Sequence, residues 1–359
     1  MVISVSLQEE SYNIYIERGA LARAGELLHL ARRVLVVTDS GVPAAYAAAV
    51  AGACELAQIC TLPAGESSKS FESYQLLLRA MLRLGMTRGD CVAAVGGGIP
   101  WLVNLERCKR LDRVVSIGGI MNGTSNFIMD AMHASPVSFP DILKKAQDLG
   151  YAEADPSADI DGDDIRRKLA ISANVAFDAL IDEEAIPTFG IRTVTDGDIA
   201  AFQRRGFVSK LLAAAQLSKE GICAWIEPTL VESHALEAAV PQNFNLITYY
   251  GESIGRQSFF GQGAGRYPTA YNVVQDCIDI LGGQRSFYAA DMAPAHLDLA
   301  GEAHPYYVRT EGHDDWLDSI TVDRWENGVI TSAVSVGKMI AWAKHRLKAD
   351  PTCFIAGIR

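Results

Sequence analysis

Several features are scarce in this chain of 359 residues. No stretch approaches the roughly 18 uninterrupted apolar residues that a membrane-spanning helix needs, and the first residues lack the basic start and apolar block of a signal peptide. The seven cysteines are odd in number and never form a C-x-x-C pair, which argues against a disulfide framework or a zinc cage and suits a reducing cytoplasm. Basic residues are outnumbered 32 to 43, so neither nucleic acid nor a membrane is expected as a partner. These absences predict a cytoplasmic protein that acts on small molecules.

The remaining composition is that of an ordinary globular chain. Hydrophobic residues make up 49% and charged residues 21%, close to globular averages, which excludes wholesale disorder. At roughly 100–200 residues per domain, the length allows two domains or three. The sequence contains no internal repeat, low-complexity run or long Gly/Ser linker.

Strands and helices alternate over about the first 98 residues. VISVSL and YNIYIERG show period-2 apolar placement around a polar EES, which predicts a hairpin. Arg33–Asp39 (RVLVVTD) is a nearly continuous apolar run, as expected for a strand covered on both faces. A later strand, CVAAV, runs directly into three glycines. This alternation predicts an α/β fold, with a Rossmann-like, doubly wound parallel sheet in this part of the chain.

The three glycines follow a strand at the place where open α/β sheets bind ligands. Taken alone they indicate a plain tight turn as readily as a phosphate site. However, VLVVTDSGVPAAY and TLPAGESSKSFESYQLLLRAMLRLGMTRGDCVAAVGGG resemble the NAD-binding region of 3-dehydroquinate synthase over about residues 1–98. That resemblance implies that NAD is bound by Asp39, on the adenosine side, and by Glu66, Lys69, Gly96, Gly97 and Gly98.

This first resemblance stops at the glycines. The chain continues with Ile99, Pro100 and Trp101 and does not supply the later lysines and Glu/His metal ligands of that family. We therefore rank 3-dehydroquinate synthase activity last among the functions considered.

An acidic segment at 150–169, GYAEADPSADIDGDDIRRKL, contains the side chains best suited to chemistry. Asp161-Gly162 is a plausible helix start, which places Asp164 in the first turn and Lys168 four residues later on the same face. A surface ion pair explains the helix alone, but not the crowding of carboxylates, which repel one another unless a substrate ammonium, a lysine or a metal ion offsets them. The crowded residues are Glu153, Asp155, Asp159, Asp161, Asp163 and Asp164.

An α-amino acid would provide the ammonium that such a cluster calls for. Its side-chain alcohol would then be the oxidisable group, and a nearby amine could exchange the hydroxyl proton as hydride leaves.

From the glycines onward, about residues 96–300 resemble the catalytic region of homoserine dehydrogenase. The resemblance rests on GGGIPWLVNLERCKRLDRVVSIGGIMNGTSNFIMDAM, the acidic segment, GIRTVTDGDIAAFQRRGFVSKLLAAA and FFGQGAGRYPTAYNVVQD, in the family's order and spacing. It implies NAD- or NADP-dependent interconversion of L-aspartate 4-semialdehyde and L-homoserine, in threonine and methionine biosynthesis.

The same resemblance implies a role for each matching residue. Lys168 would transfer the proton, while Glu153 and Asp164 would hold the amino and hydroxyl groups of the substrate. Further substrate contacts would come from Thr124, Tyr151 and Asp159, and cofactor contacts from Gly150, beside the nicotinamide, and from Gly263 and Gly265, near the phosphates.

The family also binds a monovalent cation through a glutamate and backbone carbonyls. Val92 stands in place of that glutamate, while Val95, Gly97 and Ile99 could still offer their carbonyls as metal ligands. The family's own G-x-G-x-x-G turn and a second lysine near the hydride have no counterpart here. These departures motivate an alternative, a non-catalytic or repurposed protein that binds a nucleotide or an amino acid.

The combined prediction is a three-part chain. Residues 1–98 form the nucleotide-binding-like domain, 99–305 an α+β catalytic and dimerisation domain with a mixed sheet, and 306–359 a C-terminal αβ extension. The resemblance implies a homodimer. No residue decides between NAD and NADP.

Overall fold

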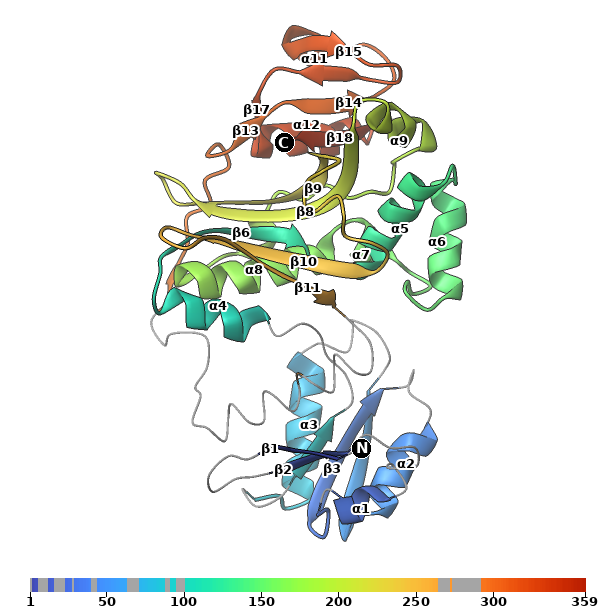
Figure 1. Cartoon of the computed structure of the whole chain (residues 1–359), viewed down its shortest axis with the longest axis vertical. Helices are drawn as coiled ribbons and strands as arrows, with labels where there is room; N and C mark the ends of the chain where they lie inside the picture. The colour runs from blue at the N-terminus through green and yellow to red at the C-terminus, as the bar shows by residue number, and fades with distance from the viewer. Residues whose placement is uncertain are drawn as a thin grey trace. The chain divides into compact units, whose positions relative to one another are not determined.

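The computed structural model describes residues 2–5, 12–15, 23–27, 29–39, 44–62, 71–87, 91–94, 101–263, 272 and 292–359. The chain divides into two compact units, Met1–Gly96 with Thr269–Val273, and Gly97–Pro268 with Val274–Arg359. Figure 1 labels the elements of each unit. Among the described residues, no helix is both long and apolar enough to span a bilayer.

The N-terminal unit contains a parallel sheet with a helix on each face (Figure 1). Its strand order is β4-β3-β5, and alternate residues of β3 point to opposite faces. Val34 and Val36 pack with Ala47 of α2, whereas Leu35 packs with Cys60 and with Ala80 of α3. The elements are α1 (Ala24–Leu27), β3 (Arg33–Asp39), α2 (Ala44–Gly52), β4 (Leu56–Leu62), α3 (Phe71–Arg83) and β5 (Cys91–Ala94).

Two predictions about the fold of this unit, the hairpin and the parallel sheet, are confirmed in the described residues. The hairpin forms from β1 (Val2–Val5) and β2 (Tyr12–Tyr15), which pair antiparallel. β3 pairs in parallel with both β4 and β5, as a doubly wound sheet requires.

The second unit is built on a nine-stranded sheet of order β11-β10-β6-β8-β9-β18-β14-β16-β15. All its pairings are antiparallel except β9 with β18, so the predicted mixed sheet is confirmed. The strands are β6 (Val114–Ile120), β8 (Phe207–Leu217), β9 (Ile222–Glu232), β10 (Phe244–Gly251), β11 (Gly255–Gln262), β14 (Tyr306–Arg309), β15 (Thr321–Arg324), β16 (Val329–Thr331) and β18 (Phe354–Ile358).

Helices on this sheet position the acidic segment. α8 packs against β6 and β8, and α4 packs on α8 (Figure 1). The helices are α4 (Trp101–Lys109), α5 (Gly123–Ala134), α6 (Phe139–Asp148), α7 (Ser157–Ile160), α8 (Asp163–Phe177), α9 (Asp196–Gln203), α11 (Asp315–Ile320) and α12 (Val336–Arg346). Four short strands complete the unit: β7 (Ala179–Leu180), β12 (Ala293–Pro294), β13 (Ala303–His304) and β17 (Val334–Ser335).

The sheet runs without interruption across the predicted boundary at 305/306, since β14 and β18 continue it beyond β9. The boundaries at 98/99 and 305/306 stay predictions. The helix predicted from AYNVVQDCIDIL lies outside the described residues, apart from Asn272.

A buried carboxylate ties α9 to β14. Asp198, with no exposed surface, accepts hydrogen bonds from the Thr195 backbone nitrogen at 2.9 Å and from the Tyr307 hydroxyl at 2.7 Å. The Arg309 guanidinium also donates to it, at 2.8 Å. Burial, and next the Asp198 charge, raise the pKa of Tyr307 above its usual range, so that its hydroxyl stays protonated and donates.

Candidate active site

The centre of the site is an ion pair within the first turns of α8. Lys168 Nζ lies 2.6 Å from Asp164 Oδ2 and also donates to the Met121 carbonyl at 3.2 Å. The two partners differ in environment, because 46% of the Lys168 side chain is exposed but only 8% of the Asp164 side chain. The ammonium is thus held by a buried carboxylate while it remains accessible.

Asn122 joins two carboxylates of the site. Its Nδ2 donates to Asp159 Oδ1 at 2.7 Å and to Asp164 Oδ2 at 2.9 Å. Its Oδ1 accepts from the Ser125 backbone nitrogen, so the same side chain caps the N-terminus of α5. Asn122 was not predicted from the sequence, although an asparagine directly before the first residue of a helix is a recognisable N-cap signal.

Asp159 is a carboxylate of the site whose pKa is raised. Burial raises its pKa above the ordinary value, and the nearby Asp164 charge adds to the rise. The Asn122 hydrogen bond, the Lys168 charge and the Thr124 hydroxyl oppose it. A carboxyl group with a raised pKa favours the folded state most when protonated, so its contribution to stability is lost as pH rises through that pKa.

We therefore expect Asp159→Asn to raise the melting temperature at pH 7 by about 1–3 °C, with a difference that shrinks below about pH 4. Asp155→Asn is the matched control. Asp155 is exposed, and hydrogen bonds from Ser157 lower its pKa, so its neutralisation should bring no gain. Thermal melts of both variants between pH 4 and 8 check the sign. A loss of stability at pH 7 in Asp159→Asn would contradict it.

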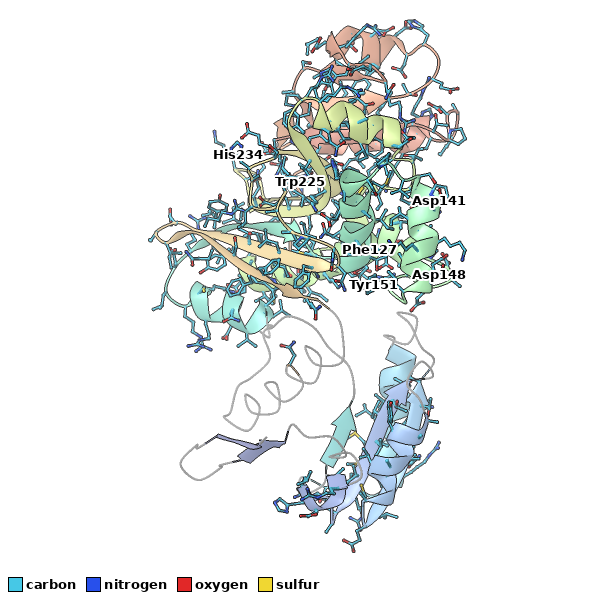
Figure 2. The ribbon with its side chains drawn as sticks, turned by 45° about the vertical axis from the view of Figure 1, so that its right-hand side comes forward. Phe127, Asp141, Asp148, Tyr151, Trp225 and His234 are labelled. Carbon is cyan, nitrogen blue, oxygen red and sulfur yellow. The ribbon has the colours of Figure 1, made fainter. Side chains whose placement is uncertain are left out.

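Thr124 and Tyr151, two substrate contacts that the resemblance implies, lie together. Thr124 Oγ1 donates to the Tyr151 carbonyl at 2.6 Å. The Tyr151 ring, 39% exposed, meets the Phe127 ring edge-to-face at 5.0 Å (Figure 2). Gly150, at φ +75°, ends the turn after α6, and no atom lies within 4 Å of the place where its Cβ would be.

The acidic side chains of this segment differ in what offsets their charge. Asp161 pairs with Arg192 at 2.6 Å, and Asp163 with Arg166 at 3.3 Å, so these two form surface ion pairs and need no ligand cation. Glu153 is exposed, and its backbone carbonyl accepts a hydrogen bond from Gln147, while no described residue bonds to its carboxylate.

A cavity of about 220 Å³ brings Lys168 together with residues that lie far apart in the sequence. Its wall is mostly apolar, and the Trp101 indole, which donates to Ser172 Oγ at 3.0 Å, forms part of it. Gly263, a predicted cofactor contact, lines the same cavity. The lining residues are Trp101, Leu102, Met121, Lys168, Ile171, Ser172, Asn245, Ile247 and Gly263.

Most of the predicted dinucleotide and cation ligands lie outside the described residues. Asp39 ends β3, and the structure describes its backbone but not its side chain. Within the described part of the chain, no three His, Cys, Asp or Glu side chains are grouped to hold a metal ion. The predicted residues outside the description are Glu66, Lys69, Val95, Gly96, Gly97, Gly98, Ile99 and Gly265.

In sequence comparison, the acidic segment lies within a region that is similar to a known family. Residues 100–278 match the family model described as homoserine dehydrogenase. The chain is 42% identical to homoserine dehydrogenase of Bacillus subtilis over 193 residues, which cover 54% of this chain and 45% of that protein. It is 40% identical to homoserine dehydrogenase of Synechocystis over 227 residues, which cover 62% of this chain and 52% of that protein. The chain therefore spans about half the length of the curated relatives that it matches.

Structural comparison agrees. The crystal structure of a homoserine dehydrogenase from Thiobacillus denitrificans matches with a TM-score of 0.63 and 25% identity, over 95% of this chain and 84% of that one. The matched sequence contains Asn122, Asp159, Asp164, Lys168 and most of the cavity wall. Residues 100–278 are therefore similar to homoserine dehydrogenases in sequence, and the chain is similar to one of them in fold.

Proposed function

We propose that this chain is an NAD- or NADP-dependent oxidoreductase that interconverts L-aspartate 4-semialdehyde and L-homoserine. The observation that carries the proposal is the Lys168 ammonium, partly exposed and held by a buried carboxylate beside a cavity. Its position in the region that matches homoserine dehydrogenases supports this reaction over other amino-acid oxidations.

Lys168 has the proton chemistry that the reaction needs. In the reducing direction it donates a proton to the aldehyde oxygen, which becomes the hydroxyl of homoserine, and in the reverse direction it accepts that proton. Asp164 holds the amine in place through the 2.6 Å contact. Asn122, which donates to both Asp164 and Asp159, fixes the two carboxylates.

The remaining acidic groups suit the ammonium of the substrate. Glu153 is exposed, and no described residue engages its carboxylate, which leaves that group available to a ligand cation. Asp159 and Asp164 contribute negative charge on the buried side. Thr124 Oγ1 donates its hydrogen to the Tyr151 carbonyl and retains lone pairs that can accept from a donor such as that ammonium.

The cavity fits a nicotinamide ring. Its wall is mostly apolar, and it includes the side chain of Asn245, whose buried Oδ1 has no hydrogen-bond partner in the described structure. When bound, NADPH or NADH would supply the hydride for the aldehyde carbon. Gly150 and Gly263 would contact the cofactor, together with Gly265.

The finer assignments follow from the resemblances in the sequence. We propose that residues 1–98 hold the rest of the dinucleotide as in 3-dehydroquinate synthase, through Asp39, Glu66, Lys69 and the glycines 96–98. The carbonyls of Val95, Gly97 and Ile99 are proposed for a monovalent cation, and no proton step depends on it. We further propose a cytoplasmic homodimer.

The test is a direct assay with the purified chain. Loss of dihydronicotinamide absorbance is expected when L-aspartate 4-semialdehyde is added to the protein with NADPH or NADH, and L-homoserine should appear in equal amount. A variant at exposed Lys144, which pairs with Asp148 on α6, should match the wild type. Binding of NADPH or homoserine without turnover would instead favour the non-catalytic alternative.

A further inference from the structure

Asn245, on β10, carries a buried polar group that has no hydrogen-bond partner in the part of the chain that the structure describes. The residue is 5% exposed, and its Oδ1 accepts no hydrogen bond from the described residues. Buried side-chain amides in folded proteins are nearly always hydrogen-bonded, so an unpartnered one indicates a bond made to something else.

The surroundings of Asn245 show where that bond can be made. Asn245 lines the same cavity as Lys168, with Trp101 and Ile247 in the apolar wall. A Cβ on Gly263 would lie 2.2 Å from Asn245 Nδ2, so a larger residue at that position would displace the amide from its present place. Gly263 therefore accommodates an amide whose Oδ1 accepts no hydrogen bond from the described residues.

We propose that the Asn245 side chain binds the carboxamide of the nicotinamide ring and fixes the orientation of the ring beside Lys168. The inference rests on the proposed function and adds to it a positioning residue. A primary carboxamide carries N–H donors and a carbonyl acceptor, as asparagine does, so its NH₂ group can donate to the unpartnered Oδ1.

The zwitterionic substrate is a poorer occupant of this part of the cavity. An ammonium and a carboxylate are costly to place against an apolar wall, whereas a flat aromatic ring is not. The carboxylates that suit an ammonium, Asp159 and Asp164, do not line the cavity. A ring with one amide substituent matches an apolar wall with one free amide.

Orientation is what this contact would determine. A nicotinamide can rotate about its bond to the ribose and present either face, and only one rotamer places its carboxamide at Asn245. Asn245 therefore selects the face from which the hydride leaves, while Lys168 supplies the proton.

The test compares two dinucleotides that differ only at the carboxamide. Dissociation constants of NADPH and of its reduced 3-acetylpyridine analogue, in which a methyl group replaces the NH₂, are measured by fluorescence titration. The wild type should prefer NADPH by roughly three- to tenfold, the worth of one hydrogen bond. Asn245→Ala and Asn245→Leu should bind the two dinucleotides equally.

Thr248→Val is the matched control. Thr248 is buried on the same strand, but its hydroxyl pairs with Ser258 Oγ at 2.9 Å and it does not line the cavity. This variant should keep the wild-type preference for NADPH. Asn245→Leu should melt no lower than the wild type, because Oδ1 has no described bond to lose, so a binding change in that variant reports on the contact and not on unfolding.

Each outcome decides the inference. Equal binding of both dinucleotides by the wild type overturns it, and so does a preference that persists in Asn245→Leu. Wild-type protein that binds neither dinucleotide overturns it together with the proposed function. If the wild type turns over normally but Asn245→Leu still prefers NADPH, this inference alone is overturned. If Asn245→Leu loses the preference but the wild type shows no turnover, only the proposed function is overturned.

Discussion

Replacement of Lys168 by alanine is expected to lower kcat for semialdehyde reduction by about 10²–10⁴-fold, the usual contribution of a positioned proton donor. The KM for the semialdehyde should change little, because Lys168 acts on the oxygen that gains charge as the hydride arrives. The fold should survive, since 46% of the Lys168 side chain is already exposed and Asn122 still donates to Asp164. Steady-state kinetics with a melting curve of each variant measure both effects.

Lys168→Arg separates proton transfer from electrostatics. An arginine keeps the positive charge and the pairing with Asp164, but its guanidinium does not release a proton at any ordinary pH. We therefore expect kcat of Lys168→Arg to fall nearly as far as that of the alanine variant, with the melting temperature unchanged. A kcat within tenfold of the wild type would show that Lys168 contributes charge and that another group moves the proton.

The local part of the site was predictable from the sequence. Asp164 and Lys168 are four residues apart on one helix, so their contact follows from helical geometry alone. The predicted helix start is also confirmed: Gly162, at φ +93°, is the N-cap of α8. A glycine takes this left-handed conformation without strain.

The contacts between distant segments were not predictable in the same way. Asn122 reaches Asp159 and Asp164 across 37 and 42 residues, and no spacing rule connects them. Asn245 enters the cavity because β10 pairs with β6 in the sheet, which a single sequence does not reveal. Crowding of carboxylates was a weaker signal than it seemed, because Asp161 and Asp163 are offset by arginines and not by a ligand.

The aromatic residues of β10 and β11 differ in exposure according to the face of the strand on which they lie. Tyr249 is 1% exposed, whereas Tyr250 is 44% and Phe260 55% exposed. Successive residues of a strand face opposite sides, and in the described structure every second residue of β11, Phe260 among them, is exposed.

Removal of the buried Asp198 carboxylate is expected to cause the largest loss of stability. Asp198→Ala leaves the Tyr307 hydroxyl, the Arg309 guanidinium and the Thr195 cap without their shared acceptor. Because 16% of the Arg309 side chain is exposed, its charge would be left largely buried and unpaired. The free energy of unfolding should fall by about 3–5 kcal/mol, measured by urea denaturation.

Two further variants separate charge from hydrogen bonding in this network. Asp198→Asn keeps an acceptor for Tyr307 but loses the charge opposite Arg309, so its loss should lie between the wild type and Asp198→Ala. Asp196→Ala removes an exposed acid from the same first turn of α9 and should cost about 0.5 kcal/mol or less. Since Asp198 makes no described contact with Lys168 or Asp164, kcat of the folded fraction should be unchanged in all three. A loss below 1 kcal/mol in Asp198→Ala would mean that Arg309 finds other partners, and that the strands after residue 305 are not held to α9 by this carboxylate.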